Sequence, residues 1–233
     1  MPPPLVLADA AKTFTMHLRD GLKLPVLEGV SFSVKAGECT VLGGPSGAGK
    51  SSILKMIYGN YSVDRGRIIV AHRGRPVDIA RAGPRELLAV RRDTVGYVSQ
   101  FLRALPRIAA VEVVAEPLVG QGVDRAAALA RAATMLGRLN LPERLWRLPP
   151  ATFSGGEQQR VNIARSLIAD YPILLLDEPT ASLDRANRDG VIDLIRQRRD
   201  QGTAIVGIFH DVAVRDAIAT RTHNVALPGG AAA

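Results

Sequence analysis

One stretch, Gly43-Gly44-Pro45-Ser46-Gly47-Ala48-Gly49-Lys50-Ser51-Ser52, sets the fold class predicted for this chain. Within it, residues 44–51 match the phosphate-loop pattern G-x-x-x-x-G-K-[ST] (Walker A) at every fixed position. The apolar run Thr40-Val41-Leu42 precedes the loop and predicts a short buried strand. A helical pattern follows and ends at Gly59. The glycines are therefore predicted to lie on a turn between a strand and a helix.

The chemistry of this loop suits a nucleoside triphosphate with Mg²⁺. Glycine has no Cβ, so the backbone can curl and direct several N–H groups at one point. The helix that begins near Lys50 adds unpaired N–H groups and the positive end of its dipole. Lys50 supplies a charge for the β- and γ-phosphates, and the Ser51 hydroxyl can ligate Mg²⁺. The alternative is a glycine-rich turn that binds nothing, and the flanking patterns argue against it.

The composition sets outer limits on class and location. With 233 residues, the chain is long enough for one large domain or for a domain with a subdomain. It has no apolar run near the ~20 residues that span a bilayer and no signal peptide, so a cytoplasmic location is expected, with a membrane reached only through a partner. The single cysteine, Cys39, cannot form an internal disulfide, and no Cys/His cluster has metal-ligand spacing.

The chain is basic, with 30 Lys and Arg against 22 Asp and Glu and a net charge of +8. A nucleic-acid partner would fit that charge, but no basic run interleaved with aromatics and no nucleic-acid module is present. A solvated basic surface, or one that faces an acidic protein, is the favoured interpretation.

Polar side chains follow three predicted strands at the points where these strands end. The strands cover residues 95–98, 173–176 and 204–209, and they are followed by Gln100, by Asp177 with Glu178, and by His210. Ligands of α/β folds bind at the carboxyl edge of the sheet. Two unpaired carboxylates after a buried strand would be costly, so a metal explains Asp177 and a general base explains Glu178. Taken alone, Gln100 could be a polar strand end and His210 a structural histidine.

A predominantly helical segment runs from about residue 106 to residue 170 and predicts a helical subdomain inserted between strands. Near its end, Ser154 with Glu157 predicts a capping box, which is a purely structural explanation for the serine. Gly155 and Gly156 in the first helical turn are costly, and the close approach of an anion to the helix N-terminus would explain them. Far upstream, Phe14 lies in a predicted strand and either packs in the core or stacks on a nucleobase.

Together these residues resemble the ABC-type ATPases. The matching elements occur in the family's order and spacing over essentially the whole chain, and they are the phosphate loop, Gln100, Ser154-Gly155-Gly156-Glu157-Gln158, residues 173–178, Ser182-Leu183-Asp184 and His210. The Ser-Gly-Gly-x-Gln element is the one specific to this class. The resemblance implies an α/β fold with a RecA-like mixed sheet core, an antiparallel β subdomain and the helical subdomain at about 106–170, within a single domain over 1–233.

The resemblance also implies roles for the matching residues. Members of the family bind ATP between two subunits arranged head to tail. One copy would supply Phe14 to the nucleobase, Glu178 as the base that polarises water and His210 to hold the γ-phosphate. Its Mg²⁺ ligands would be Ser51, Gln100 and Asp177. Its phosphate loop would consist of Gly44, Pro45, Ser46, Gly47, Ala48, Gly49, Lys50, Ser51 and Ser52. The second copy would supply Ser154 and Gly156 to the γ-phosphate. Asp184 matches the aspartate of the loop between the subunits, and Gly155 and Gln158 are implied as further nucleotide-binding residues. Phe153 and Ser52 depart from the usual leucine and threonine without removing a catalytic group.

A narrower resemblance is to the PhnL-type subunit of the bacterial phosphonate carbon–phosphorus lyase system. It rests on five segments that ATP chemistry does not require, residues 98–103, 106–108, 141–146, 170–173 and 207–211. It implies an ATP-hydrolysing subunit that supports formation of a ribose-phosphonate triphosphate, with other lyase subunits, including a sister ABC subunit, as partners.

Two other functional classes remain open. One is the ATPase motor of a membrane transporter, in which Leu102, Leu105, Ile108 and Val111 would line a docking groove. The other is a nucleotide-gated assembly factor. The sequence leaves open the choice between ATP and GTP, between a homodimer and a sister ABC partner, and what hydrolysis drives.

Overall fold

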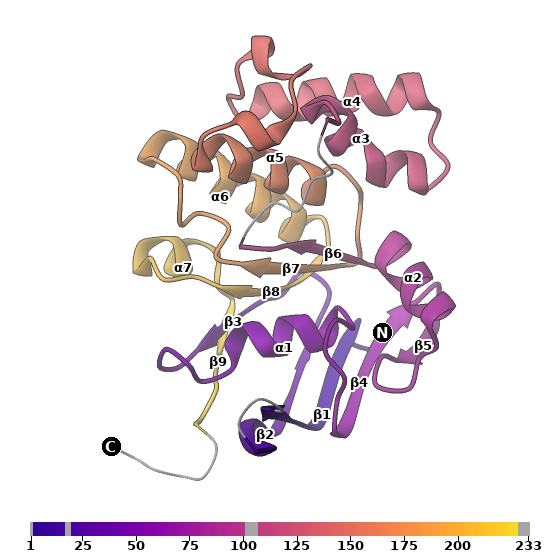
Figure 1. Ribbon diagram of the computed structural model, residues 1–233, viewed down its shortest axis with the longest axis vertical. Coiled ribbons are helices and arrows are strands. Elements are labelled where there is room, and N and C mark those ends of the chain that lie inside the picture. Colours follow the sequence, from indigo (N-terminus) through magenta and orange to yellow (C-terminus); the bar gives the residue numbers. More distant parts are fainter. Residues whose placement is uncertain (1, 17–19, 101–106, 228–233) are drawn as a thin grey trace.

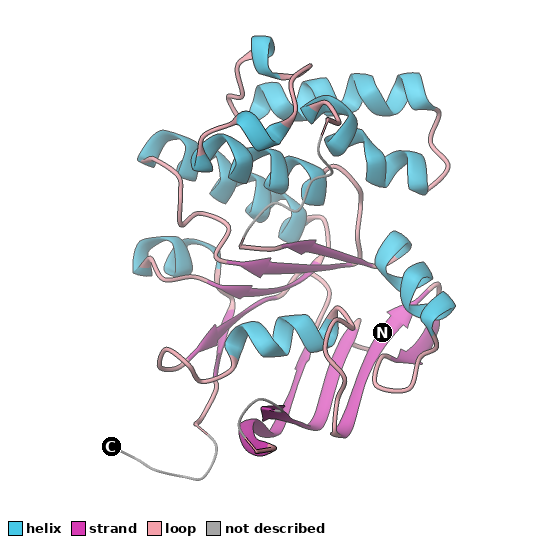
Figure 2. Cartoon of the chain, in the orientation of Figure 1, coloured by secondary structure: helices cyan, strands magenta, loops and turns pink. Residues whose placement is uncertain are grey.

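The computed structural model describes residues 2–16, 20–100 and 107–227. These residues form two β-sheets with helices on either side of the larger one (Figures 1 and 2). The larger sheet has the strand order β6-β7-β8-β3-β9 and is parallel in every pair, with β6 Val95–Val98, β7 Ile173–Asp177, β8 Ala204–Ile208, β3 Cys39–Gly43 and β9 Arg221–Asn224. The smaller sheet is antiparallel, with β2 Leu22–Val34, β1 Leu5–Met16, β4 Arg65–His72 and β5 Arg75–Asp78 in that order.

The α-helices are α1 Lys50–Ile57, α2 Pro84–Asp93, α3 Ala110–Gly120, α4 Arg125–Arg138, α5 Gly155–Leu167, α6 Arg185–Asp200 and α7 Val212–Ile218. Two short 3₁₀ turns, Glu143–Leu145 and Pro150–Thr152, lie between α4 and α5. All of α3 to α5 enters the chain between β6 and β7, which are neighbours in the sheet. This placement agrees with the predicted helical insertion, whose limits of about 106–170 within one domain stay a prediction.

The parallel sheet separates two apolar cores because successive side chains of a strand point to opposite faces. Leu174 of β7 belongs to a core with side chains of α3 to α7, whereas Leu175 belongs to a core with α1 and the antiparallel sheet. The same alternation divides Val41 from Leu42 in β3. Helix α1 therefore covers one face of the sheet and α5 and α6 cover the other, as Figure 1 shows.

Most predicted elements are present, and three points differ. The pattern Arg73-Gly74-Arg75-Pro76 predicts a turn over these four residues, but only Arg73-Gly74 turns the chain, and Arg75 already begins β5. Helix α7 and strand β9 were not predicted. Strand β9 is short and polar because it lies at an edge of the sheet, where it pairs with β3 alone and buries little apolar surface.

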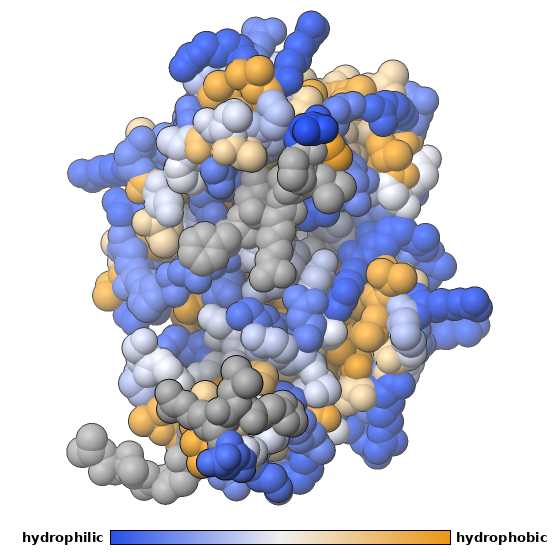
Figure 3. Space-filling model, viewed as in Figure 1, coloured by the Kyte–Doolittle hydropathy of each residue, from blue (hydrophilic) through white to orange (hydrophobic). Residues whose placement is uncertain are grey.

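The surface is largely polar. Hydrophilic side chains cover most of the face seen in Figure 3, and apolar groups are scattered among them. Across the described ranges, no helix combines the length and the apolar character needed to cross a membrane.

One buried charge ties the antiparallel sheet together. Lys12 of β1 is 7% exposed, and its ammonium donates to Asp64 Oδ1 at 2.8 Å and to Ser62 Oγ at 2.9 Å. Asp64 Oδ2 accepts the Thr13 N–H at 2.7 Å. Partial burial raises the pKa of Asp64, but the hydrogen bonds from Lys12 and Thr13 outweigh it and lower the pKa below its usual value.

Asp64→Asn should lower the free energy of unfolding by about 1 kcal/mol at neutral pH, since Asp64 is partly exposed and the pair is screened. Because the pKa of Asp64 is lower in the folded chain, its contribution is complete above the unfolded pKa of about 4 and is lost as the pH falls through the folded value. The free energy of unfolding that Asp64→Asn loses should therefore become smaller as the pH falls, and urea unfolding at several pH values measures it. Asp200, whose side chain is 65% exposed beside Arg199, offers the control Asp200→Asn, which should change stability by less than about 0.5 kcal/mol at any pH. Equal effects of the two substitutions would contradict the prediction.

Candidate functional site

The carboxyl ends of four parallel strands meet at one edge of the larger sheet. In the register, Val98 of β6 lies beside Leu176 of β7, and Asp177 lies beside Ile208 of β8. The phosphate loop leaves β3, which pairs with β8 on its other side. The predicted residues that follow these strands, Gln100, Asp177, Glu178 and His210, therefore belong to the same edge as the loop. Gln100 is exposed there, one residue before a segment outside the described residues.

Asp177 is the most buried charged group of this edge, with 4% of its surface exposed. Ser51, at the start of α1, donates its hydroxyl to Oδ1 at 3.0 Å, and Tyr97 of β6 donates its phenol to Oδ2 at 3.1 Å. Burial raises the pKa of Asp177 above its usual value, although the two hydrogen bonds act in the opposite direction. The pKa of Tyr97 is also raised, by burial and then by the neighbouring carboxylate.

These groups fit a Mg²⁺ ion that is completed by phosphate. Proteins hold Mg²⁺ with one or two carboxylates plus waters and phosphate oxygens, not with an all-protein cage. The described parts of the chain contain no cluster of three His, Cys, Asp or Glu side chains that could bind a metal by themselves. The Asp177 carboxylate and the Ser51 hydroxyl provide oxygen donors of the kind that such an ion requires. Burial disfavours the charged form of Asp177, and a bound cation would offset that cost.

Glu178 and His210 are paired in the structure. Glu178 Oε1 and His210 Nε2 are 2.7 Å apart, and the histidine side chain is 67% exposed against 19% for the glutamate. Glu178 has a φ of 53°, in the left-handed region that a residue with a side chain enters at a cost. Its N–H nevertheless donates to Ile208 O at 3.1 Å, which fixes the turn after β7 against β8. The carboxylate is thus held at the sheet edge beside the loop.

The phosphate loop depends on backbone that only glycine allows. Gly44 has a φ of 119°, and a Cβ there would lie 2.5 Å from Val225 O, just beyond β9. Gly49 has a φ of 87° and would place a Cβ 2.7 Å from Leu27 Cδ2. Lys50 lies across the loop and donates to the carbonyl oxygens of Gly44 and Pro45 at 2.9 and 2.7 Å. Gly44, Ser46 and Gly47 are exposed and can direct N–H groups at a ligand, whereas Pro45 has no N–H group.

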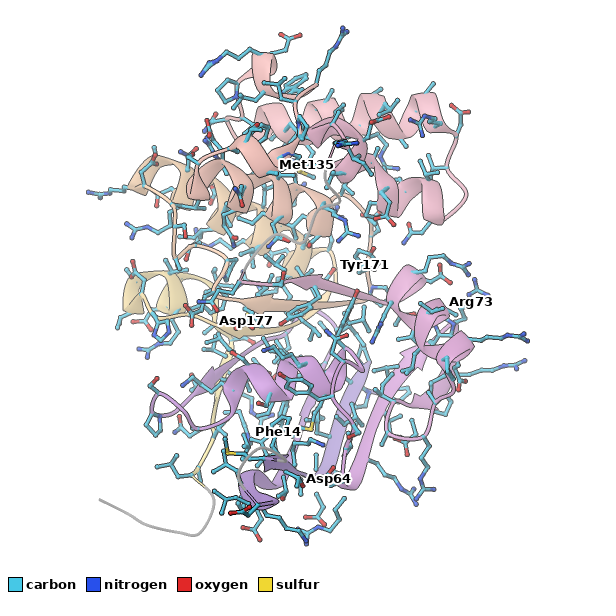
Figure 4. All side chains as sticks on the ribbon, viewed as in Figure 1. Phe14, Asp64, Arg73, Met135, Tyr171 and Asp177 are labelled. Carbon is cyan, nitrogen blue, oxygen red and sulfur yellow. The ribbon has the colours of Figure 1, made fainter. Side chains whose placement is uncertain are left out.

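Phe14 is partly exposed and is not a core residue. Its ring meets Tyr61 edge to face with centroids 5.1 Å apart, and Lys12 Nζ lies 5.3 Å from its centroid. It lines an open cavity together with Lys12, Thr13, Thr15, Lys23 and Asp64. Figure 4 shows Phe14 and Asp64 near the antiparallel sheet and Asp177 among the parallel strands. The core interpretation of Phe14 is therefore wrong, and the role in nucleobase stacking stays a prediction.

The capping box predicted at α5 is present. Ser154 Oγ accepts from Glu157 N at 3.4 Å, and Glu157 Oε2 accepts from Ser154 N at 2.8 Å. The two glycines differ, because a Cβ on Gly155 would meet nothing within 4 Å, whereas one on Gly156 would lie 3.0 Å from Ser182 O. The close approach of a ligand is thus not the only reason for Gly156, since the chain's own backbone also needs that space.

Asp184 and Gln158 also have structural partners. Asp184 caps α6 by accepting from Asn187 N at 2.9 Å, and Gln158 Nε2 donates to Phe153 O at 3.0 Å. These contacts lie on the α5 face of the sheet, away from α1. The structure therefore brings Ser51, Asp177, Glu178 and His210 to the loop and leaves the Ser154 segment on the opposite side.

Sequence reasoning missed several residues that surround the site. Tyr97 was treated as part of a buried strand, although a phenol next to a strand end is able to reach a neighbouring carboxylate. Gln159, Asn162 and Ser166 of α5 are buried polar residues. Their spacing of three and four residues on a helix that is otherwise apolar inside was the signal that could have revealed them.

Comparison with known proteins matches this geometry to one family. The profile of the ABC transporter family matches residues 27–181. The chain belongs to the ABC transporter family. Its phosphate loop, buried Asp177 and capped α5 are thus parts of an ABC-type ATPase, and such ATPases use ATP with Mg²⁺.

Several relatives of this ABC chain are similar over nearly their full length. It is 37% identical to the lipoprotein-releasing system ATP-binding protein LolD of Novosphingobium aromaticivorans, with 97% of this chain and 98% of that protein covered. It is 42% identical to LolD 2 of Caulobacter vibrioides, covering 90% and 89%. The ABC transporter ATP-binding protein YtrE of Bacillus subtilis is 36% identical, with 89% of each chain covered.

Solved ABC structures confirm the predicted fold class. A dimeric bacterial ABC transporter cassette superposes with a TM-score of 0.86 at 29% identity, covering 95% of this chain and 94% of that one. A dimeric ATP-binding cassette in a post-hydrolysis state, bound to ADP and Pi, gives 0.85 at the same identity and coverage. Both parallel and antiparallel strands are expected in this ABC fold. In the structure, the parallel strands form the larger sheet and the antiparallel strands form the smaller one.

Tyr97→Phe should destabilise the fold by about 1–2 kcal/mol, because it leaves Asp177 Oδ2 buried without its donor. Since the lost hydrogen bond favours the carboxylate, the pKa of Asp177 should rise further. Thermal unfolding in the absence of nucleotide measures the first effect. Tyr171→Phe is the matched control, because Tyr171 lines the same cavity as Tyr97 without touching Asp177, and it should cost less. Equal losses would show that the Tyr97 phenol contributes nothing specific.

Proposed function

We propose that this chain is the Mg²⁺-dependent ATP-hydrolysing subunit of a membrane transporter and that it acts as a head-to-tail pair. One observation carries the proposal. The two helix N-termini suited to anions, at Lys50 and Ser154, lie on opposite faces of the parallel sheet. The sheet lies between them within a single copy, and a second copy would bring its α5 to the loop. The dimeric state of the similar cassettes supports this arrangement.

The residues of one copy divide the chemistry among them. ATP supplies the phosphoanhydride bond that water cleaves. The loop and Lys50 would hold the β- and γ-phosphates, and Ser51, Asp177 and Gln100 would hold Mg²⁺. Glu178 would accept a proton from the attacking water, and His210, 2.7 Å from it, would orient the carboxylate and contact the γ-phosphate.

The second copy would close the site over the γ-phosphate. Ser154 and Gly156 at the start of α5 would direct a hydroxyl and N–H groups at it, with Gly155, Gln158 and Asp184 flanking them. Gly155 is well suited to this approach because the space around it is open. Phe14 would stack on the base, a contact that does not distinguish ATP from GTP.

The transporter assignment is supported by the names of the relatives, which include two lipoprotein-releasing system subunits and an ABC transporter subunit. This chain would bind a membrane-spanning permease and would then act at the cytoplasmic side. Of the predicted docking residues, Leu102 and Leu105 lie outside the described residues. Ile108 and Val111 are partly buried against the core, so they also have a packing role.

A second candidate is the ATPase subunit of a phosphonate carbon–phosphorus lyase, with other lyase subunits and a sister ABC subunit as partners. It is favoured by the five sequence segments that resemble the PhnL type, part of which lies outside the described residues. Packing accounts for some of the others. Trp146 donates its indole N–H to Leu141 O at 2.9 Å, and Gly207 leaves room for the Phe209 ring. Such segments preserve local structure, which weakens them as evidence of a lyase partner.

Glu178→Gln should bind ATP and dimerise but hydrolyse it about 10²–10⁴-fold more slowly, because a positioned base contributes that much to the rate. Phosphate release and gel filtration with Mg·ATP measure the two properties. Lys50→Ala is the contrasting variant, which should lose nucleotide binding and remain monomeric. Normal turnover in Glu178→Gln would exclude Glu178 as the base, and retained affinity in Lys50→Ala would exclude the role of the loop.

Affinity purification with ATP-trapped Glu178→Gln from its native cells would separate the two partner classes. We expect an integral membrane permease to be recovered, and Lys50→Ala should recover less of it under the same conditions. Recovery of soluble lyase subunits without a permease would establish the second candidate in place of the first.

A further inference from the structure

Three buried polar side chains of α5 form a stripe for which the ATP site has no direct use. Gln159, Asn162 and Ser166 are 4%, 3% and 5% exposed. They are three and four residues apart, so they lie on one face of the helix. We call them the α5 stripe. Apolar residues would bury this face at less cost, since a buried polar group is tolerated only when it is hydrogen-bonded.

Each member of the α5 stripe donates a hydrogen bond to the main chain at the sheet edge. Ser166 Oγ donates to Tyr97 O at 2.9 Å, and Asn162 Nδ2 donates to Ser99 O at 2.6 Å. Gln159 Nε2 donates to Pro179 O at 3.0 Å.

The three acceptors lie next to residues of the ATP site. Tyr97 holds Asp177 through its phenol, Ser99 precedes Gln100, and Pro179 follows Glu178. One face of α5 therefore fixes the main chain at the carboxyl ends of β6 and β7, next to the residues of the ATP site.

The other end of the same helix begins at Ser154, which would contact the nucleotide of the second copy. Gln159 lies only five positions after Ser154, which is about one and a half turns. Helix α5 runs without a proline from Gly155 to Leu167 and packs against α3 and α4. Helix α5 is therefore one rigid element that connects Ser154, which would contact the nucleotide of the second copy, to the stripe beside the copy's own ATP site.

We propose that the α5 stripe couples the two ATP sites of the pair by holding Ser99 and Pro179 in fixed register with α5. Engagement of Ser154 with the second copy's nucleotide then positions Gln100 and Glu178 of the first copy. Directional hydrogen bonds fix this register, whereas an apolar face could slide. The three side chains touch no nucleotide, so they are positioning residues. The inference rests on the proposed function and assigns a route for communication within it.

The test is steady-state hydrolysis by the full-length Asn162→Ala variant. It should lower kcat at least tenfold and bring the Hill coefficient for ATP towards one. The affinity of the loop for a non-hydrolysable ATP analogue should change less than threefold, because none of the three side chains is hydrogen-bonded to the loop. Ser166→Ala, a milder change, should act in the same direction, and Ser166→Thr should restore the parent values because it keeps the hydroxyl.

Thr220→Val is the matched control. The Thr220 hydroxyl donates to Cys39 O at 3.1 Å and accepts from Cys39 N at 2.9 Å, so it also bonds the main chain of a central strand, but at the amino end. This variant should lose stability without a change in kcat or Hill coefficient. The double variant Ser154→Ala with Asn162→Ala should lose at least threefold less kcat than the product of the two single losses predicts. The reason is that both substitutions disrupt the same coupling.

Several results would overturn the coupling. One is that Asn162→Ala and Thr220→Val lower the melting temperature equally and also lower kcat equally. Others are an unchanged Hill coefficient in both stripe variants, or single effects that multiply in the double variant. These results leave the proposed function standing as long as the parent hydrolyses ATP and Lys50→Ala does not. If the parent is inactive, the proposed function fails and the coupling fails with it.

Discussion

The carboxylate of Asp177, buried at the end of an apolar strand, is the interaction on which the site depends. Its burial is costly, and the cost is offset because Ser51 and Tyr97 each donate to one of its oxygens. These two donors come from the start of α1 and from β6, so satisfying one carboxylate brings the phosphate loop and two strands into a fixed relation. A cation bound there would relieve the remaining cost, which is a physical reason for an apolar strand to end in an acid.

The alternation of side chains in the parallel sheet has an equally far-reaching consequence. It places α1 over one core and α5 over the other, so the two anion-binding helix ends of the chain lie over opposite faces of the sheet. Under the proposed function, a second copy would bring its α5 to the loop, because the sheet and its two cores lie between Ser154 and Lys50 within one copy.

Packing and function overlap in the segments that identify the family. Gly156 makes room for Ser182 O, Asp184 caps α6, and Glu157 completes a capping box, so each residue would be favoured even without a ligand. The α5 stripe is the opposite case, since apolar side chains would serve packing as well. Segments of the narrower phosphonate-lyase resemblance are partly explained by packing, and relatives named as transporter subunits support a different partner.

The sequence by itself determined the phosphate loop, most strands and helices up to β8, and the acids and amides at strand ends. These features follow from local spacing and from the cost of placing glycines or carboxylates in buried elements. Only the tertiary structure decided that Tyr97 holds Asp177, that Lys12 is buried with Asp64, that Phe14 is partly exposed, and that β9 completes the sheet. Each of these depends on contacts between residues 47 to 181 positions apart. Local pattern carries no information about such distant partners, and the face of the sheet on which a helix packs is set by the whole topology.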